Sequence, residues 1–172
     1  ARAGALSSYN PSYFDALPDD VAWTEQERLV ERASRLWASG DLAPLADVDD
    51  ALAAIDKRNP LYDAATRLRA HWRVNSGDVA RAKEAIALMD GLLVRHRATR
   101  NYLLRVAAAV AAGERDVAWP GIQHIAAGGG LRSPNIARSL YRMVRTLGIP
   151  PEDMKPVASS VARAARAARE AR

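Results

Sequence analysis

The sequence predicts an all-α protein, and three observations carry this prediction. Alanine is abundant and runs of β-branched residues are short, which favours closely packed helices over sheets. Apolar residues recur at helical spacing in several successive segments. Alternate predicted helices end at Gly40, Gly77, Gly113 and Gly148, at spacings of 37, 36 and 35 residues. A period of this length, made of helix pairs, indicates a right-handed α-solenoid of about four helical hairpins.

Length and composition limit the class of protein. A chain of 172 residues corresponds to about one domain and can bury a sizeable core. The absence of cysteine excludes a disulfide framework, a thiolate zinc site and a cysteine nucleophile, but it does not distinguish cytoplasm from periplasm. No apolar run is long enough to span a bilayer, so we expect no membrane span. The first residues, Ala-Arg-Ala-Gly, are compatible both with cleavage of a signal peptide and with an arbitrary chain start.

The first elements follow from proline, capping and periodicity. Residues 1–22 are predicted to be an irregular tail because Pro11 and Pro18 oppose a continuous helix. A helix is expected over about 24–39, since Thr24 followed by Glu27 forms a capping-box pattern. A second helix is expected from about Leu45 to the Asn-Pro pair at 59–60. A third is expected over 61–74 and a fourth from about 79 to 95.

Glycine, proline and capping residues also indicate where the later helices begin and end. A fifth helix is expected over about 100–112, and a short sixth over 117–127 with Pro120 near its first turn. The glycine-rich segment 127–130 follows, and we expect it to be a loop between repeats. Ser133 is a good N-cap before Pro134, so a seventh helix should run from there to Leu147. An eighth helix is expected from about residue 151 through the alanine- and arginine-rich end.

The spacing of the glycines has a physical explanation. Glycine adopts the left-handed conformation that ends a helix. Asp41, Asp78 and Glu114 follow the first three glycines, and an acid there suits the positive N-terminus of the next helix. Seven residues before each glycine lie Ala33, Ala70, Val106 and Tyr141, and small residues among them allow close approach of paired helices. The repeats define a helical domain over residues 23–172.

One of these units resembles a known family. The segment SGDVARAKEAIALMDGLL resembles the second half of a tetratricopeptide repeat, and WASGD and AAGERDVA resemble the same segment more weakly. The resemblance covers roughly residues 24–172, although units of 35–37 residues are closer to Sel1-like and pentatricopeptide lengths. It implies a domain similar to tetratricopeptide repeats (TPR-like or Sel1-like) that binds peptides or proteins in a concave groove.

Few residue patterns indicate catalysis. His71, His96 and His124 are not arranged in a metal-ligand spacing, and we interpret them as packed or surface residues, His124 being the best catalytic candidate. Adjacent carboxylates such as Asp49 and Asp50 do not face each other across a cleft, and we interpret that pair as a solvated helix face. We therefore expect no enzyme activity in the chain as given, no cofactor and no metal.

Charge is distributed unevenly, and arginine dominates it. Residues 1–60 have a net charge of −5 and residues 61–172 a net charge of +10, with 22 arginines and 3 lysines overall. Arginine suits carboxylate and phosphate partners. A basic stripe is expected on the seventh helix, where Arg138, Arg142 and Arg145 share one face. We predict that the binding residues are arginines on the first helix of each pair: Arg35, Arg69, Arg73, Arg105 and Arg142.

These observations predict a non-catalytic scaffold or accessory module of bacterial type that binds a protein or peptide, possibly an acidic one. Two alternatives remain. The chain could be a superhelical, non-catalytic segment of a larger cell-wall or polysaccharide enzyme, or a basic nucleic-acid-binding helical repeat. The acidic first 60 residues argue against nucleic acid, because they would repel a phosphate backbone running along the solenoid. The sequence identifies neither the partner, nor the compartment, nor the oligomeric state.

Overall fold

The computed structural model describes residues 24–128 and 134–150, with six single helical positions beyond residue 150. Within these ranges the chain forms helices and no strand, which confirms the all-α prediction. The predicted tail over 1–22, the boundary at residue 23, the glycine-rich loop beyond residue 128 and most of the predicted eighth helix lie outside the described residues. The helices are α2 (Glu25–Ser39), α3 (Leu45–Ala53), α4 (Tyr62–Asn75), α5 (Val79–Arg95), α6 (Thr99–Ala111), α7 (Arg115–Ala127) and α8 (Pro134–Thr146).

Two helices begin with the caps that the sequence indicated. The Thr24 side chain accepts a hydrogen bond from the backbone N–H of Glu27, and the Glu27 carboxylate accepts one from the backbone N–H of Thr24 at 2.8 Å, which completes the capping box. Asp78 accepts hydrogen bonds from Ala80 N and Arg81 N at the start of α5. Glu114 does not cap α7 in this way and forms an ion pair with Lys83 at 2.7 Å. Asp41 lies four residues before α3 begins. Of the three acids expected to cap helices, only Asp78 does so by a hydrogen bond.

The repeating glycines all adopt the left-handed conformation. Gly40, Gly77, Gly113 and Gly148 have φ values of 76°, 74°, 72° and 61°, and no other described residue has positive φ. L-residues with a side chain rarely adopt this conformation, so each glycine can end one helix where another residue would be strained. The regular spacing in the sequence therefore corresponds to a regular backbone feature.

Helix α3 is shorter than expected. It ends at Ala53, whereas the apolar periodicity predicted a helix continuing to Asn59. Two side chains offer the backbone an alternative to the helix. Asp56 accepts a hydrogen bond from Arg58 N at 2.7 Å, and Asn59 accepts one from Leu61 N at 2.8 Å. Such local bonds compete with helical hydrogen bonds, which explains why the residues after Ala53 form turns.

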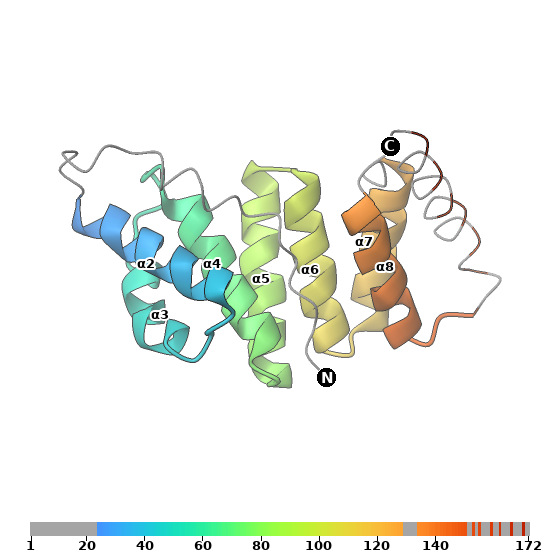
Figure 1. Ribbon diagram of the computed structural model, residues 1–172, viewed down its shortest axis with the longest axis horizontal. Coiled ribbons are helices and arrows are strands. Elements are labelled where there is room, and N and C mark those ends of the chain that lie inside the picture. The colour runs from blue at the N-terminus through green and yellow to red at the C-terminus, as the bar shows by residue number, and fades with distance from the viewer. Residues whose placement is uncertain are drawn as a thin grey trace.

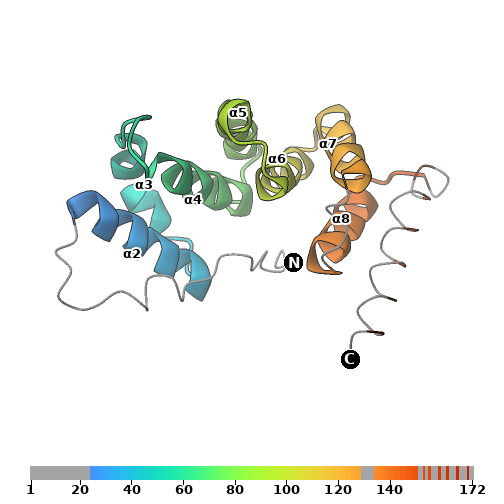
Figure 2. The ribbon, with the colours of Figure 1, turned by 90° about the horizontal axis from the view of Figure 1, so that it is seen from above.

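The helices form two rows that follow an arc. Figure 1 shows them side by side in chain order, and Figure 2 shows that α2, α4, α6 and α8 form an inner row while α3, α5 and α7 form an outer one. Successive helices of the inner row pack on each other, and each also packs on its outer neighbours. No comparable packing joins the outer helices in the described part of the chain. Because the helices of the inner row pack on each other and those of the outer row do not, the array curves toward the inner row.

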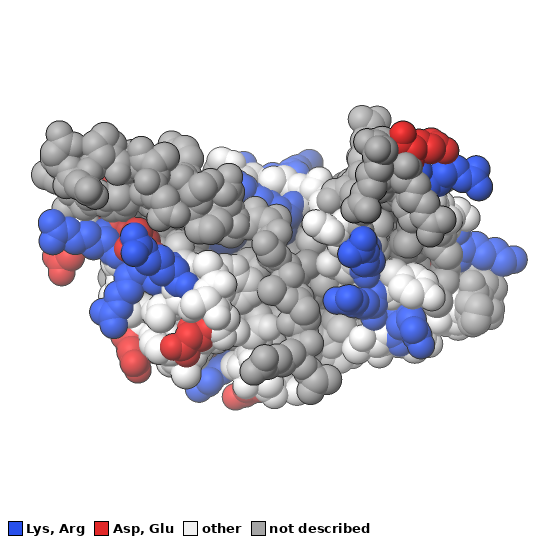
Figure 3. All heavy atoms as spheres, viewed as in Figure 1, with Lys and Arg blue, Asp and Glu red and all other residues white. Residues whose placement is uncertain are grey.

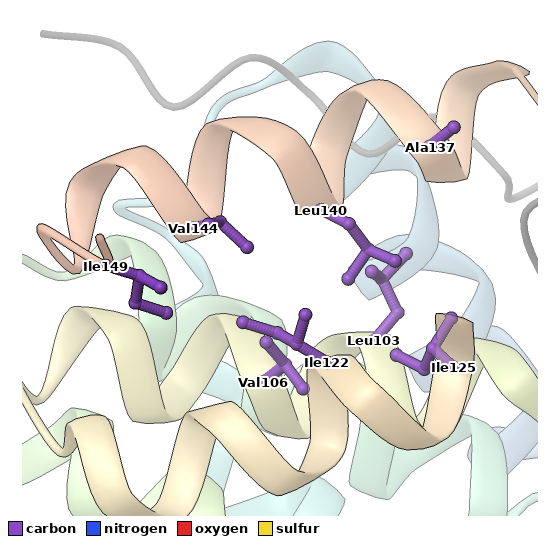
Figure 4. Packing of buried hydrophobic residues seen from close by; sticks show 8 residues of the cluster. All are labelled: Leu103, Val106, Ile122, Ile125, Ala137, Leu140, Val144 and Ile149. Carbon is purple, nitrogen blue, oxygen red and sulfur yellow. The ribbon is translucent and has the colours of Figure 1, made fainter. Parts of the chain in front are cut away.

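Three clusters of buried apolar side chains follow one another along this array. The first joins α2, α3 and α4, the second joins α4, α5 and α6, and the third joins α6, α7 and α8. Figure 4 shows the third cluster, in which side chains of α8 point toward α6 and α7. Its members are Leu103, Val106, Ile122, Ile125, Ala137, Leu140, Val144 and Ile149.

Buried positions recur at fixed distances from the glycines. The residues five, eight and twelve positions after Gly40, Gly77 and Gly113 are buried in all three outer helices. They are Leu45, Val48 and Leu52, then Ala82, Ala85 and Met89, then Ala118, Gly121 and Ile125. Before the glycines, Ala33, Ala70 and Val106 are fully buried as expected, but Tyr141 is 37% exposed. Tyr141 shares the spacing of this series but not its burial, because α8 buries Leu140 and Val144 instead.

Close packing of α7 on α6 explains why residue 121 is a glycine. A Cβ atom built on Gly121 of α7 would lie 2.6 Å from Cγ2 of Val106 on α6. No real Cβ contact is that short, so α7 can pack this closely only because residue 121 has no side chain.

Candidate interaction surface

Three of the five arginines predicted to bind a partner, Arg69, Arg73 and Arg105, form hydrogen bonds with aspartates of the protein itself. Arg73 is buried, and its two terminal nitrogens each donate a 2.7 Å hydrogen bond to one carboxylate oxygen of Asp49 on α3. Arg69 Nε donates to the same carboxylate at 3.0 Å. Arg73 Nε also donates to Glu84 on α5 at 2.9 Å. The resulting network links three successive helices.

The position of Asp49 was not expected from the sequence. We interpreted Asp49 and Asp50 as a solvated face, yet Asp49 is only 8% exposed while Asp50 is exposed. Asp49 lies nine residues after Gly40, where the other two outer helices have Ile86 and Ile122. A carboxylate at this apolar register position requires cationic partners, and the two arginines of α4 supply them. The register of the repeats was the signal that could have revealed it.

The ion pairs of this network favour the charged forms of Asp49 and Arg73. Burial by itself would raise the pKa of Asp49, but hydrogen bonds from Arg73 and Arg69 and their positive charges outweigh it, so the pKa lies below its usual value. The hydrogen bond to Asp49 is the main cause that raises the pKa of Arg73. Both groups are charged at neutral pH, and the buried Arg73 directs its guanidinium at Asp49, Glu84 and the carbonyl oxygen of Arg69.

Arg105 repeats the arrangement one unit later. Its Nε donates to Asp90 on α5, and its Nη1 donates to the carbonyl oxygen of Val117 at 3.2 Å. In both units an aspartate of the outer helix therefore engages an arginine of the next inner helix. Arg35 of α2 pairs within its own helix with Glu31, and its side chain is 72% exposed.

Arg142 differs from the other four. It lies on α8 with Arg138 and Arg145, and all three are exposed. No described residue places a carboxylate within ion-pairing distance of any of them. Helix α7, which precedes them, has a single acidic residue, Asp116 in its first turn. Counted back from Gly148, the positions of α8 that correspond to Arg73 and Arg105 are the buried Val144 and Leu140. The arginines of α8 therefore lie on another face of the helix, where they are exposed.

An exposed tyrosine completes this surface. Tyr141 lies three residues after Arg138 and next to Arg142, so the four side chains occupy one helical stripe. We call this the α8 stripe: Arg138, Tyr141, Arg142 and Arg145. Sequence reasoning assigned no function to Tyr141, although its spacing from Arg138 and Arg145 was visible. In Figure 3 basic side chains gather over α8, while acidic ones lie mainly over the α2–α3 end.

The histidines are packed against aromatic or acidic neighbours. His71 stacks on Trp37 with ring centroids 4.1 Å apart, and burial, together with the nearby charge of Arg67, lowers its pKa to about 4. His96 lies 2.8 Å from a carboxylate oxygen of Asp63. His124, the best catalytic candidate from the sequence, is exposed and lies beside Tyr102 at 4.3 Å between ring centroids. No nucleophile or carboxylate accompanies His124 in the contacts of the described residues.

Neither a metal-ion site nor a membrane-spanning helix is found among the described residues. These residues contain no cluster of three His, Cys, Asp or Glu side chains that could hold a metal ion. None of their helices combines the length and the apolar character that crossing a bilayer demands. Comparison with known proteins adds no relative: no protein-family model, no curated protein and no solved structure matches the chain.

Proposed function

We propose that this chain is a non-catalytic module of the tetratricopeptide-like class, a right-handed α-solenoid that binds a protein or peptide. The pairs α2–α3, α4–α5 and α6–α7 would be three successive hairpins, and α8 would begin a fourth. Left-handed glycines at intervals of 37, 36 and 35 residues support this division. The recurring buried register of the outer helices supports it as well, since each hairpin buries the same face against the next.

One observation carries the functional part of the proposal. The α8 stripe presents three arginines and a tyrosine to solvent without an ion-pair partner among the described residues, whereas Arg73 of α4 and Arg105 of α6 are engaged by aspartates. Tyrosine and arginine are the residue types enriched where protein interfaces concentrate their binding energy. The inner row, which lies on the inside of the arc, is the surface of such an array that a partner would follow.

A basic nucleic-acid-binding repeat is the second candidate, and the same stripe favours it. Arginines suit phosphate, and an exposed aromatic ring can stack on a base. The opposing observation is the acidic α2–α3 end, which bears Asp47, Asp50 and Asp56 on its surface and would repel a strand following the whole array. This candidate therefore ranks below protein binding. That the chain is a non-catalytic superhelical segment of a larger cell-wall or polysaccharide enzyme is compatible with both.

Site-specific photo-crosslinking tests the proposal. A benzoylphenylalanine placed at Arg35 or Arg142 of the inner row should capture a discrete protein in cells that naturally produce this chain. The matched control is Val94 of the outer helix α5, which is 82% exposed. Products that survive nuclease and appear from the inner row alone would support a protein-binding module. Equal capture from Val94, or products that nuclease removes, would contradict it.

A further inference from the structure

Helix α8 has two sharply different faces. Ala137, Leu140 and Val144 are buried, and Figure 4 shows Leu140 and Val144 pointing toward α6 and α7. The opposite face bears the α8 stripe, with residues at positions i, i+3, i+4 and i+7. These positions cover two helical turns, or about 10 Å along the axis. The inward face packs on the fold, whereas the four residues of the stripe are exposed and have no carboxylate partner among the described residues.

Arginines elsewhere in the inner row show that such side chains in this protein engage carboxylates of a neighbouring helix. Twice in the described chain an arginine of an inner helix is engaged by an aspartate of a neighbouring helix: Asp49 with Arg73, and Asp90 with Arg105. The bidentate contact between Asp49 and Arg73 shows that two helices of this array pack closely enough for carboxylate and guanidinium to meet. On α8 the arginines are present and the acidic helix is absent among the described residues.

We infer that the α8 stripe docks an acidic helical segment of another protein, whose carboxylates are spaced i, i+4 and i+7 to meet Arg138, Arg142 and Arg145. This inference rests on the proposed protein-binding function and specifies its partner. Tyr141 lies between the arginines and supplies the apolar contact that charged pairs on an exposed surface need, because such pairs alone contribute little. A stripe of about 10 Å matches two turns of one helix, not a longer polyanion.

Binding of designed peptides tests this inference. The probe is a fluorescein-labelled alanine-rich helix of about 15 residues, the length at which isolated helices become stable. It has glutamates at i, i+4 and i+7 and is measured by fluorescence anisotropy at low salt. One control peptide has glutamine at these positions, and another has the three glutamates in adjacent positions. We expect the spaced peptide to bind at least about tenfold more tightly than either control, because only it can satisfy all three arginines.

Matched charge reversals locate the site. Arg138→Glu/Arg142→Glu should weaken binding of the spaced peptide by at least about tenfold, and Tyr141→Ala should weaken it several-fold. The control is Arg28→Glu/Arg32→Glu on α2, another exposed pair at i and i+4, which makes the same change in net charge. This control should bind within about twofold of the unaltered protein. Circular dichroism of all variants verifies that each retains its helices.

The outcomes separate this inference from the proposed function. Equal binding of the glutamate and glutamine peptides, no binding at all, or equal losses from both double reversals would overturn the inference. A single-stranded oligonucleotide that binds more tightly than the spaced peptide, and is lost in Arg138→Glu/Arg142→Glu, would replace it with a nucleic-acid site. If crosslinking captures a protein through Arg35 while α8 binds no acidic helix, the scaffold function stands and this inference fails.

Discussion

At the scale of single residues, the tightest constraint lies where α6 and α7 touch. Ala33, Ala70 and Val106 occupy one register position in the inner helices, and Val48, Ala85 and Gly121 occupy one in the outer helices. The largest inner residue, Val106, is accompanied by the smallest outer one, Gly121. The contact between Gly121 and Val106 leaves no room for a further carbon atom, so a single added methyl group should lower the stability of the fold.

Two glycine-to-alanine changes should therefore have opposite effects on stability. Gly121→Ala would place a methyl group 2.6 Å from Val106 Cγ2, and we expect it to lower the free energy of unfolding by about 1–3 kcal/mol. Gly91→Ala in α5 meets no atom within 4 Å and should raise it by up to about 1 kcal/mol, since alanine favours helix. Urea unfolding of both variants measures the difference. An equally stabilising Gly121→Ala would mean that α7 packs less closely on α6.

His71 should make stability depend on pH below neutrality. Its pKa falls from 6.5 to about 4 in the folded state, chiefly because of burial, so the unfolded chain binds a proton that the folded chain rejects. Stability from neutral His71 is complete above about pH 6.5 and is lost as the pH falls toward 4. His71→Phe keeps a ring on Trp37 but cannot be protonated, and should reduce the loss between pH 7 and 4.5 by roughly 2 kcal/mol. Chemical denaturation at the two pH values measures this loss, and an unchanged loss would rule out His71 as its source.

At the scale of helices, the buried ion pair between α3 and α4 replaces an apolar contact. Asp49 holds the register position of Ile86 and Ile122, so the chain substitutes a charged network for a hydrophobic residue in one repeat only. Buried ion pairs seldom stabilise more than the apolar residues that could take their place, although loss of one partner is costly. We therefore expect the network to specify which helices pair more than it adds to stability.

Asp49→Ile and its double variant test this distinction. Asp49→Ile alone should lower the free energy of unfolding by about 3 kcal/mol or more, because Arg73 would be buried without its main partner. Asp49→Ile/Arg73→Leu should return to within about 1 kcal/mol of the original protein. The exposed neighbour Asp50→Ile serves as control and should change stability by less than about 0.5 kcal/mol. A double variant as unstable as the single one would show that the network itself stabilises the fold.

The same residues show what sequence can and cannot predict. Glycine conformation and the Thr24 cap depend on neighbouring residues only, so local patterns predicted them correctly. The end of α3 at Ala53 escaped prediction because side chains of Asp56 and Asn59 compete with an otherwise helical periodicity. Sequence alone could not distinguish arginines that pair inside the protein from arginines that stay exposed. The difference depends on whether the fold places an aspartate near the arginine, as it does for Arg73 but not for Arg142 among the described residues. Whether any of the five predicted arginines binds a partner stays a prediction.

At the scale of the whole molecule, helices in the middle of the array have more neighbours than those at its ends. Helix α6 packs on α4, α5, α7 and α8, whereas the main packing partners of α2 among the described helices are α3 and α4. Hydrogen exchange followed by mass spectrometry should therefore show the slowest amides in α5 and α6, and faster exchange in α2 and α3. Exchange as slow in α2 as in α6 would mean that the array opens as one cooperative unit.

The close packing of inner helices on their successors also determines how the protein responds to tension. Among the described helices, packing joins near neighbours along the array, and no comparable packing joins α2 to α8. We therefore expect tension applied between α2 and α8 to detach the helices successively, each step releasing a short length of chain. A partner bound along the inside of the arc would connect adjacent helix pairs. We therefore expect a bound partner to raise the force that is needed to separate them.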